Sequence, residues 1–312
     1  EFRAPATDSA ALAVVPRSAT TYVTGAPLDV AVDVVSATPP DSVTLSMRHA
    51  GAGWFRRYAM RAGAGYEYSA RLPADSLGEG PIEYAVTVVR GDSATTFPEG
   101  LHQRPWDWNF HGREFWTGTM VSPTTPLRLF SAGADVPRLA FSRIGDAGRS
   151  GVFRTVLSSL TGEPALHLEL PGGVDDYTAS LVVKERVAGR GASGARATAV
   201  KVRMRGVGPR AVAHLTLVEK DGTSWSAAIT PDSSWSERRI PLSAFAPAKA
   251  AMLPQGFPGT WNYWMGPAAG RGGSGDAPRI QDLERVELSL RRDDGAPAGS
   301  GVEVEAVWLL FD

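Results

Sequence analysis

The sequence predicts an all-β protein made of two β-sandwich modules. Apolar and polar residues alternate along several short runs, of which Leu28 to Val35 (LDVAVDVV) and Ile82 to Val89 (IEYAVTVV) are the clearest. Pro, Gly and Asp close these runs, and no long helical pattern separates them. A chain of 312 residues is long enough for two cores. Antiparallel strands joined by turns therefore predict sandwiches and exclude a fold of alternating strands and helices.

Composition and charge exclude several classes of function. The net charge is -1, with 21% charged and 43% hydrophobic residues, so we expect no nucleic-acid partner and no electrostatic membrane attachment. Cysteine is absent, which excludes disulfides, thiolate metal sites and cysteine nucleophiles. No apolar run approaches the roughly 20 residues of a membrane span, so none is predicted.

The first module covers residues 8–100. After the strands at Leu28 to Val35 and Val43 to Met47, the stretch YEYSARLPADSLGEGPIEYAVTVVRGDSATTFP, residues 66–98, places a proline-bearing turn between two Tyr-containing strands. This stretch resembles the end of the immunoglobulin-like or fibronectin-like modules of secreted carbohydrate-active enzymes. The resemblance implies an immunoglobulin-like β-sandwich. The hairpin-like GAGWFRRYAMRAGAGYEY before it displays Trp54, and we expect one of its rings to pack inward and another to add a secondary contact.

Residues 101–126 (LHQRPWDWNFHGREFWTGTMVSPTTP) are rich in aromatic residues and show no clean period. A flexible linker is rich in Gly, Ser or Pro and poor in rings, so the segment is predicted to be an ordered joint in which the rings seal an interface. The alternative, that Trp106 and Trp108 form a ligand platform, stays open.

The second module, residues 127–312, contains about eight further alternating runs, which are typical of a jelly roll. The strand from Ala211 leads through DGTSWSAAI to SSWSERRIPLSAF, and the chain closes with LERVELSLRRDDG and GVEVEAVWLLFD. These stretches resemble the middle and the last strands of galactose-binding-like carbohydrate-binding modules. The resemblance implies a secreted, periplasmic or cell-surface protein whose partners are a polysaccharide or oligosaccharide and an attached or associated catalytic domain.

The strands of the second module have one apolar and one polar face. Lys201, Arg203 and Arg205 alternate with apolar residues, and His214 and Thr216 do the same on the next run. We place these polar residues on one face of a single sheet. That face is either simply solvated or a shallow sugar-binding trough in which Arg203 or His214 binds hydroxyls.

The loop WNYWMGPAAGRGGSGD, residues 261–276, is the main candidate binding site. A pyranose offers C–H bonds on one face and hydroxyls at its edge, so a site for it combines flat rings with planar polar groups. The loop supplies both kinds of group: Trp261, Tyr263 and Trp264 as platforms, and Asn262, Arg271 and Asp276 as hydrogen-bonding groups. The alternative, that two of the rings fill the end of the core, stays open.

Three further tryptophans belong to the strands of the second module. Trp225 alternates with serines and is added to the candidate ligand-binding residues. Trp235 and Trp308 are expected in the core.

No catalytic residue is predicted. The sequence has no HExxH, GxSxG, P-loop or dinucleotide-binding motif, and its five histidines have no metal-ligand spacing. His102 and His111 share their segment with Asp107 and Glu114, but packing explains this grouping more simply. No cofactor is required, although the galactose-binding-like resemblance implies a structural calcium ion near Asp135 and Asp312.

The sequence thus favours a non-catalytic carbohydrate-binding accessory region of a secreted polysaccharide-processing protein. One alternative is a structural scaffold that braces a catalytic domain outside this chain. A glycosidase or lyase with an unrecognised site is the third possibility.

Overall fold

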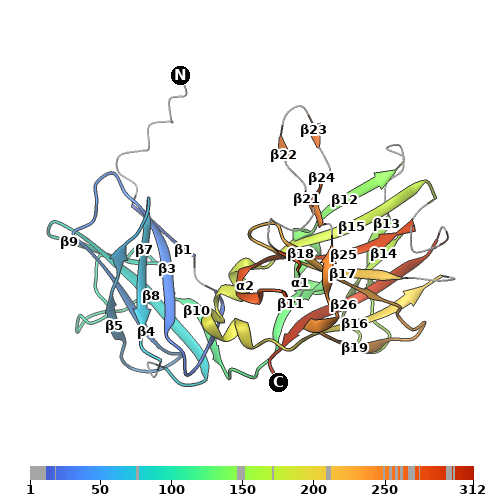
Figure 1. Ribbon diagram of the computed structural model, residues 1–312. Helices are drawn as coiled ribbons and strands as arrows, with labels where there is room; N and C mark the ends of the chain where they lie inside the picture. The colour runs from blue at the N-terminus through green and yellow to red at the C-terminus, as the bar shows by residue number, and fades with distance from the viewer. Residues whose placement is uncertain are drawn as a thin grey trace. The chain divides into compact units, whose positions relative to one another are not determined.

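The computed structural model is all-β, as the alternation predicts, and divides into two units. The first unit is Glu1–Pro123 with Ala188–Ser193, and the second is Thr124–Val187 with Gly194–Asp312. Figure 1 shows their strands. The structure describes residues 12–17, 19–74, 77–145, 152–170, 172–208, 212–248, 250–252, 255–256, 259–260, 263–265, 271–273, 275–292, 297 and 299–312.

The first unit contains two sheets. One has the order β1 (Ala13–Pro16), β3 (Leu28–Val35), β7 (Glu67–Leu72) and β6 (Arg61–Ala62). The other has the order β2 (Thr21–Val23), β10 (Trp116–Val121), β8 (Gly80–Arg90), β4 (Ser42–His49) and β5 (Arg56–Ala59), and β9 (Ser93–Phe97) also pairs with β8. The β2–β10 pair is parallel, whereas β8 pairs antiparallel with β10, β4 and β9.

Alternation along the strands builds the core of the first unit. In β3, Leu28, Val30, Val32 and Val34 are buried, and the residues between them are not. They belong to one cluster with apolar residues of β4 and β8 in the other sheet, so the two sheets bury their apolar faces against each other.

The structure places most of residues 101–126 within the first unit rather than in a separate joint. Trp116–Val121 forms β10, which pairs with β8, and the first unit extends to Pro123. Trp116 lies beside Tyr84, with 5.6 Å between the ring centroids, and packs against the core of that unit. The lack of a clean period concealed this strand, because its apolar residues Trp116, Met120 and Val121 do not alternate strictly.

The second unit contains two larger sheets. The first, called here the β13 sheet, has the order β13 (Val152–Leu157), β14 (Pro164–Glu169), β26 (Gly301–Leu310), β16 (Ala199–Val207) and β19 (Ser236–Pro241), with β11 (Leu127–Ser131) also paired to β26. The second, the β12 sheet, has the order β12 (Ala140–Gly145), β15 (Val174–Val182), β25 (Leu283–Arg291), β17 (Ala213–Glu219), β18 (Ser224–Ile229) and β20 (Ala246–Ala248).

Smaller elements complete the second unit. Two short pairs join β21 (Ala250–Met252) to β24 (Tyr263–Met265) and β22 (Gln255–Gly256) to β23 (Gly259–Thr260). The helices are α1 (Ala132–Asp135), α2 (Lys184–Ala188), whose last residue is assigned to the first unit, and short 3-10 turns at Val136–Arg138, Leu242–Ala244 and Ile280–Asp282. A further 3-10 turn, Gly191–Arg196, begins in the segment assigned to the first unit. None of the helices in the described part of the chain has the length and apolar character that a membrane crossing requires.

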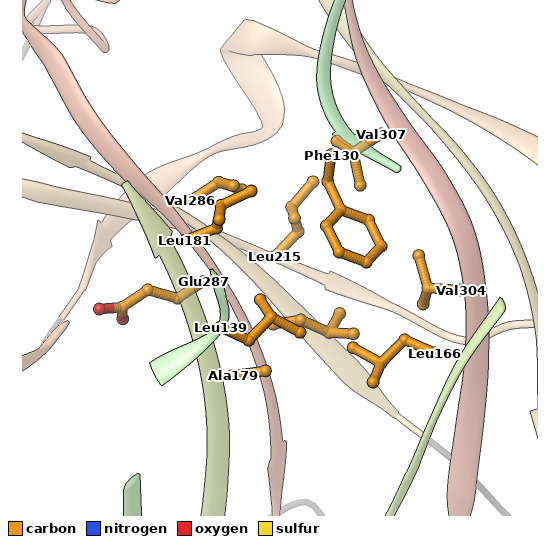
Figure 2. Close-up of a pocket in the computed structure, with 11 residues that line it drawn as sticks. Phe130, Leu139, Leu166, Ala179, Leu181, Leu215, Val286, Glu287, Val304 and Val307 are labelled. Atoms are coloured by element: carbon orange, nitrogen blue, oxygen red, sulfur yellow. The ribbon is translucent and has the colours of Figure 1, made fainter. Parts of the chain in front are cut away.

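The core of the second unit lies between its two sheets and contains a small cavity. Val200, Val304, Leu215 and Leu288 come from both sheets and belong to one buried cluster. The cavity measures about 20 Å³ and its lining is almost entirely apolar. In Figure 2 the carboxylate of Glu287 points away from the apolar side chains. A space little larger than one water, without polar partners, is a gap in core packing and not a ligand site.

Candidate functional site

Three tryptophans of the first unit present their side chains to solvent. Trp54 is 67% exposed, Trp106 37% and Trp108 97%. Large apolar side chains scattered singly on a surface are ordinary, but three indoles on neighbouring segments of one unit are not. Indoles combine a flat apolar face with one N–H donor, which suits them to recognition.

The loop that carries Trp106 and Trp108 is held by hydrogen bonds within the loop itself. The Asp107 carboxylate accepts a hydrogen bond from the Arg104 N–H at 2.8 Å, and the Asp107 N–H donates to the Arg104 carbonyl at 2.9 Å. The N–H of Phe110 donates to the Asp107 carbonyl at 3.0 Å. An Asp in a turn commonly bonds nearby backbone in this way. The hydrogen-bonded turn therefore fixes the backbone that presents both indoles.

Trp54 belongs to the connection between β4 and β5, which is also fixed. The Ala52 N–H donates to the His49 carbonyl at 3.0 Å, and Gly51 adopts φ +77°, a conformation that favours glycine. The Arg48 guanidinium donates to the Ala52 carbonyl at 2.8 Å. Both loops therefore display their indoles from defined backbone positions.

A cluster of phenylalanines joins the two segments. Phe55 lies 6.4 Å from Phe110 and 5.4 Å from Phe115, measured between ring centroids. The Arg48 guanidinium lies over Phe55 at 4.2 Å and also pairs with Glu83 at 2.9 Å. The cluster therefore fastens the loop of Trp106 and Trp108 beside that of Trp54.

Beside Trp54 the surface forms a hollow of about 200 Å³, called here the Trp54 hollow. Trp54, Arg56, Arg48 and His49 contribute to its wall, together with apolar side chains such as Leu77. Arg56 lies 5.9 Å from the Trp54 ring centroid. Among the described residues, none hydrogen-bonds the His49 imidazole. The hollow thus combines one open ring with planar polar groups.

Trp106 has a cationic neighbour of its own. The Arg57 guanidinium lies 5.0 Å from its ring centroid, within the range of a cation–π contact. For Trp108, no ring contact or hydrogen bond of the side chain occurs within the described chain, in agreement with its nearly complete exposure.

The main site predicted from the sequence lies largely outside the described part of the chain. Trp261 and Asn262 are not among the described residues. Tyr263 and Trp264 lie on β24, where Trp264 pairs with Ala251 and Tyr263 with Met252, but their side chains are not described. Recognition by these rings stays a prediction.

Arg271 is described, and it is part of a buried ion network. Its guanidinium donates to Glu219 at 2.7 Å and to Asp276 at 2.8 Å, and only 7% of its side chain is exposed. The hydrogen bond from Arg271 to Asp276, together with those from the Gly272 and Ala277 N–H groups, lowers the pKa of the Asp276 carboxyl to about 2. Arg271 fastens its own loop to the strands instead of facing solvent.

Trp225 is not an open ring platform, and the candidate role given to it from the sequence is wrong. Its side chain is 2% exposed, lies in the core cluster and donates a hydrogen bond to Glu219 at 2.8 Å. The neighbouring serines do not mark an exposed strand, since Ser224 is itself buried. Trp225 lies on the side of β18 that faces the core and pairs with the buried Leu217.

Arg203 and His214 do not share a trough, which corrects the prediction of one polar face. Arg203 lies on β16 of the β13 sheet and His214 on β17 of the β12 sheet. Because these sheets pack face to face, their polar sides are on opposite faces of the second unit. The Arg203 guanidinium forms ion pairs with Glu305 at 2.5 Å and with Glu237 at 2.7 Å.

His214 is half-buried on a polar face of short side chains. Thr178 and Ser289 are each 1% exposed, and Ser289 is the neighbour of both Thr178 and His214 in the sheet register. Burial raises the pKa of Asp176 on the same face, despite opposing contributions from Thr178, Arg291 and His214. Asp176 and Glu287 are four residues apart in register, so they are not directly opposed in the sheet.

Asp135 and Asp312 are held by arginines. Asp135 is 1% exposed and pairs with Arg186, and Asp312 pairs with Arg239 at 2.5 Å. No group of three or more metal-ligating side chains occurs among the described residues. The calcium site stays a prediction.

Trp308 is not in the core, contrary to expectation. It is half-buried, and Lys201 and Arg203 lie over its ring at 4.7 and 5.3 Å. Its neighbours Val307 and Leu309 face inward on β26, so Trp308 faces outward.

Comparison with known proteins adds little to this geometry. No family model and no curated protein matches the chain. A solved structure described as an exo-beta-agarase is similar over 58% of this chain and 25% of its own, with 13% identity and a TM-score of 0.35. A biofilm associated protein BSP domain is similar over 82% of this chain and 30% of its own, with 9% identity and a TM-score of 0.24. The chain thus spans between about a quarter and a third of either protein.

Proposed function

We propose that the exposed indoles of the first unit bind a carbohydrate, as part of a non-catalytic accessory region of a secreted polysaccharide-processing protein. The observation that carries the proposal is the open face of Trp54 beside a hollow lined by both polar and apolar side chains, together with the nearly complete exposure of Trp108. The binding needs no cofactor.

The chemistry of the hollow suits a sugar ring. The C–H face of a pyranose packs against the Trp54 indole, and its hydroxyls accept from Arg56 or exchange hydrogen bonds with the His49 imidazole. Trp106 and Trp108 supply further faces for neighbouring sugar units. Each of these contacts is weak on its own. Because the loops are already held in place before binding, little conformational entropy is lost when the sugar binds.

The test is affinity gel electrophoresis on a panel of neutral and uronate-containing polysaccharides. We expect at least one polysaccharide to retard the wild type. Replacing either Trp54 or Trp108 with alanine should weaken that binding about 10- to 100-fold, the effect of removing a central aromatic contact. Neither indole supports the core, so both variants should keep the thermal unfolding temperature of the wild type.

Tyr66→Ala is the matched control, because Tyr66 is 58% exposed in the same unit and does not line the Trp54 hollow. It should bind as the wild type does. If no polysaccharide retards the wild type, or if the two tryptophan variants are retarded equally with it, the proposal fails and the scaffold role becomes the better account.

A further inference from the structure

The outermost strand of the β13 sheet has an open backbone edge. β13 pairs with β14 on one side, and no strand of the described chain pairs with its other side. Ser158, directly after the strand, donates its N–H to the Glu163 carbonyl at 2.8 Å. Since bonded and non-bonded positions alternate along an antiparallel pair, the N–H and C=O groups of Phe153, Thr155 and Leu157 point to the open edge.

This edge lacks the features that normally prevent strand association. Natural edge strands carry lysines, prolines, bulges or inward-pointing charges. β13 reads VFRTVL, with Arg154 as its one charge, and its register to β14 has no irregularity. Phe153 is 47% exposed and Leu157 71%. All three residues therefore have open backbone hydrogen-bonding groups, and two of them, Phe153 and Leu157, also carry exposed apolar side chains.

We propose that β13 pairs antiparallel with β13 of a second copy of this chain, with Thr155 opposite Thr155 on the two-fold axis. Directly opposed residues of a sheet share a face, so a symmetric pairing places one residue opposite its own copy on the two-fold axis. The Thr155 register places Phe153 of each copy opposite Leu157 of the other, so this apolar pair forms on both sides of the two-fold axis. All three edge-facing residues then donate and accept across the pair.

Charge favours this register and permits this partner. Centring the pair on Arg154 opposes two arginines directly, which destabilises a sheet. In the Thr155 register Arg154 faces Val156 of the second copy instead. The whole chain has a net charge of -1, so two copies do not repel each other strongly.

The dimer goes beyond carbohydrate binding and does not depend on it. Two copies would present two sets of exposed indoles, so a polymeric glycan would be bound with higher avidity than by one copy.

Cysteine cross-linking tests the register, because the chain has no cysteine of its own. Thr155→Cys should form a disulfide-linked dimer under mild oxidation, since opposed Cα atoms lie about 5.5 Å apart. Phe153→Cys is the matched control: its symmetry mate lies four residues away, about 13 Å, and should not cross-link. Cross-linking of Arg154→Cys instead of Thr155→Cys would overturn the register.

Analytical ultracentrifugation of the wild type and of Thr155→Pro tests the dimer itself. Proline at 155 removes an edge-facing N–H but no bond to β14, so the variant should fold and sediment as a monomer, whereas the wild type should dimerise at high concentration. A circular dichroism spectrum confirms that the variant is folded. A wild type that stays monomeric, or a Thr155→Pro variant that dimerises as the wild type does, would overturn the proposal.

Discussion

Replacing Glu219 with alanine is expected to lower the free energy of unfolding of the second unit by about 3–5 kcal/mol, the cost of breaking a buried ion pair. Glu219 is 1% exposed. Its carboxylate accepts hydrogen bonds from the Trp225 indole, the Arg271 guanidinium and the Arg279 N–H, at 2.8, 2.7 and 2.8 Å. The variant leaves the Trp225 indole N–H without its acceptor, and it leaves the buried Arg271 guanidinium with Asp276 as its nearest carboxylate.

The loss of stability should depend on the charge of the Glu219 carboxylate as well as on its size. Glu219→Gln keeps the size and one acceptor oxygen, so we expect a smaller loss of stability than with alanine. Urea unfolding followed by tryptophan fluorescence measures the difference, because Trp225 itself reports on the network.

Asp221→Asn is the control for position and charge. Asp221 also lies near Arg271, at 3.4 Å, but 43% of its side chain is exposed. Exposed ion pairs contribute about 0–1 kcal/mol, so this variant should unfold almost as the wild type does. Equal stability of Glu219→Ala and Asp221→Asn would show that the network does not stabilise the second unit.

The strands could be predicted from the sequence, because a period of two records which side of a strand is buried. β3 and β8 follow the runs LDVAVDVV and IEYAVTVV. β10 was missed, since Gly118 occupies a buried position and the apolar Val121 directly follows Met120, so apolar residues do not recur at every second position. The type of each sandwich stays a prediction.

The candidate site could be predicted only in part. Trp106 and Trp108 were named as an alternative platform and Trp54 as a minor contact, because ring type and loop position can be read locally. Their exposure cannot: it depends on whether Phe110 and Phe115 pack on Phe55 and leave the indoles outside. Similarly, alternation gives the two faces of the strands bearing Arg203 and His214, but strand order decides which sheet each strand joins.

Replacing Asp135 with alanine is expected to destabilise the second unit by about 3–5 kcal/mol at neutral pH. Its carboxylate accepts from the Arg186 guanidinium and from the Ser131 N–H, the latter at 2.9 Å, and Arg138 lies 3.7 Å away. Arg186 also donates to the Leu129 carbonyl at 2.9 Å, so the pair joins α2 to β11 and to α1. Removing the carboxylate leaves Arg186 partly buried beside an empty acceptor position.

The pH dependence should separate this ion pair from simple packing. Burial alone raises the pKa of Asp135, but Arg186, the Ser131 N–H and Arg138 outweigh it and hold the pKa below its ordinary value of 3.8. The folded state therefore binds this proton less readily than the unfolded state, so the stabilisation is present above about pH 4 and is lost as the pH falls through the folded-state pKa.

Urea titrations at several pH values measure this effect. The gap in free energy of unfolding between wild type and Asp135→Asn should be widest at neutral pH and should narrow in acid. Asp232→Asn, which removes an exposed pair with Arg238, should show only a small gap at every pH. A gap for Asp135→Asn that does not change with pH would mean that the carboxylate acts through its shape and not through its charge.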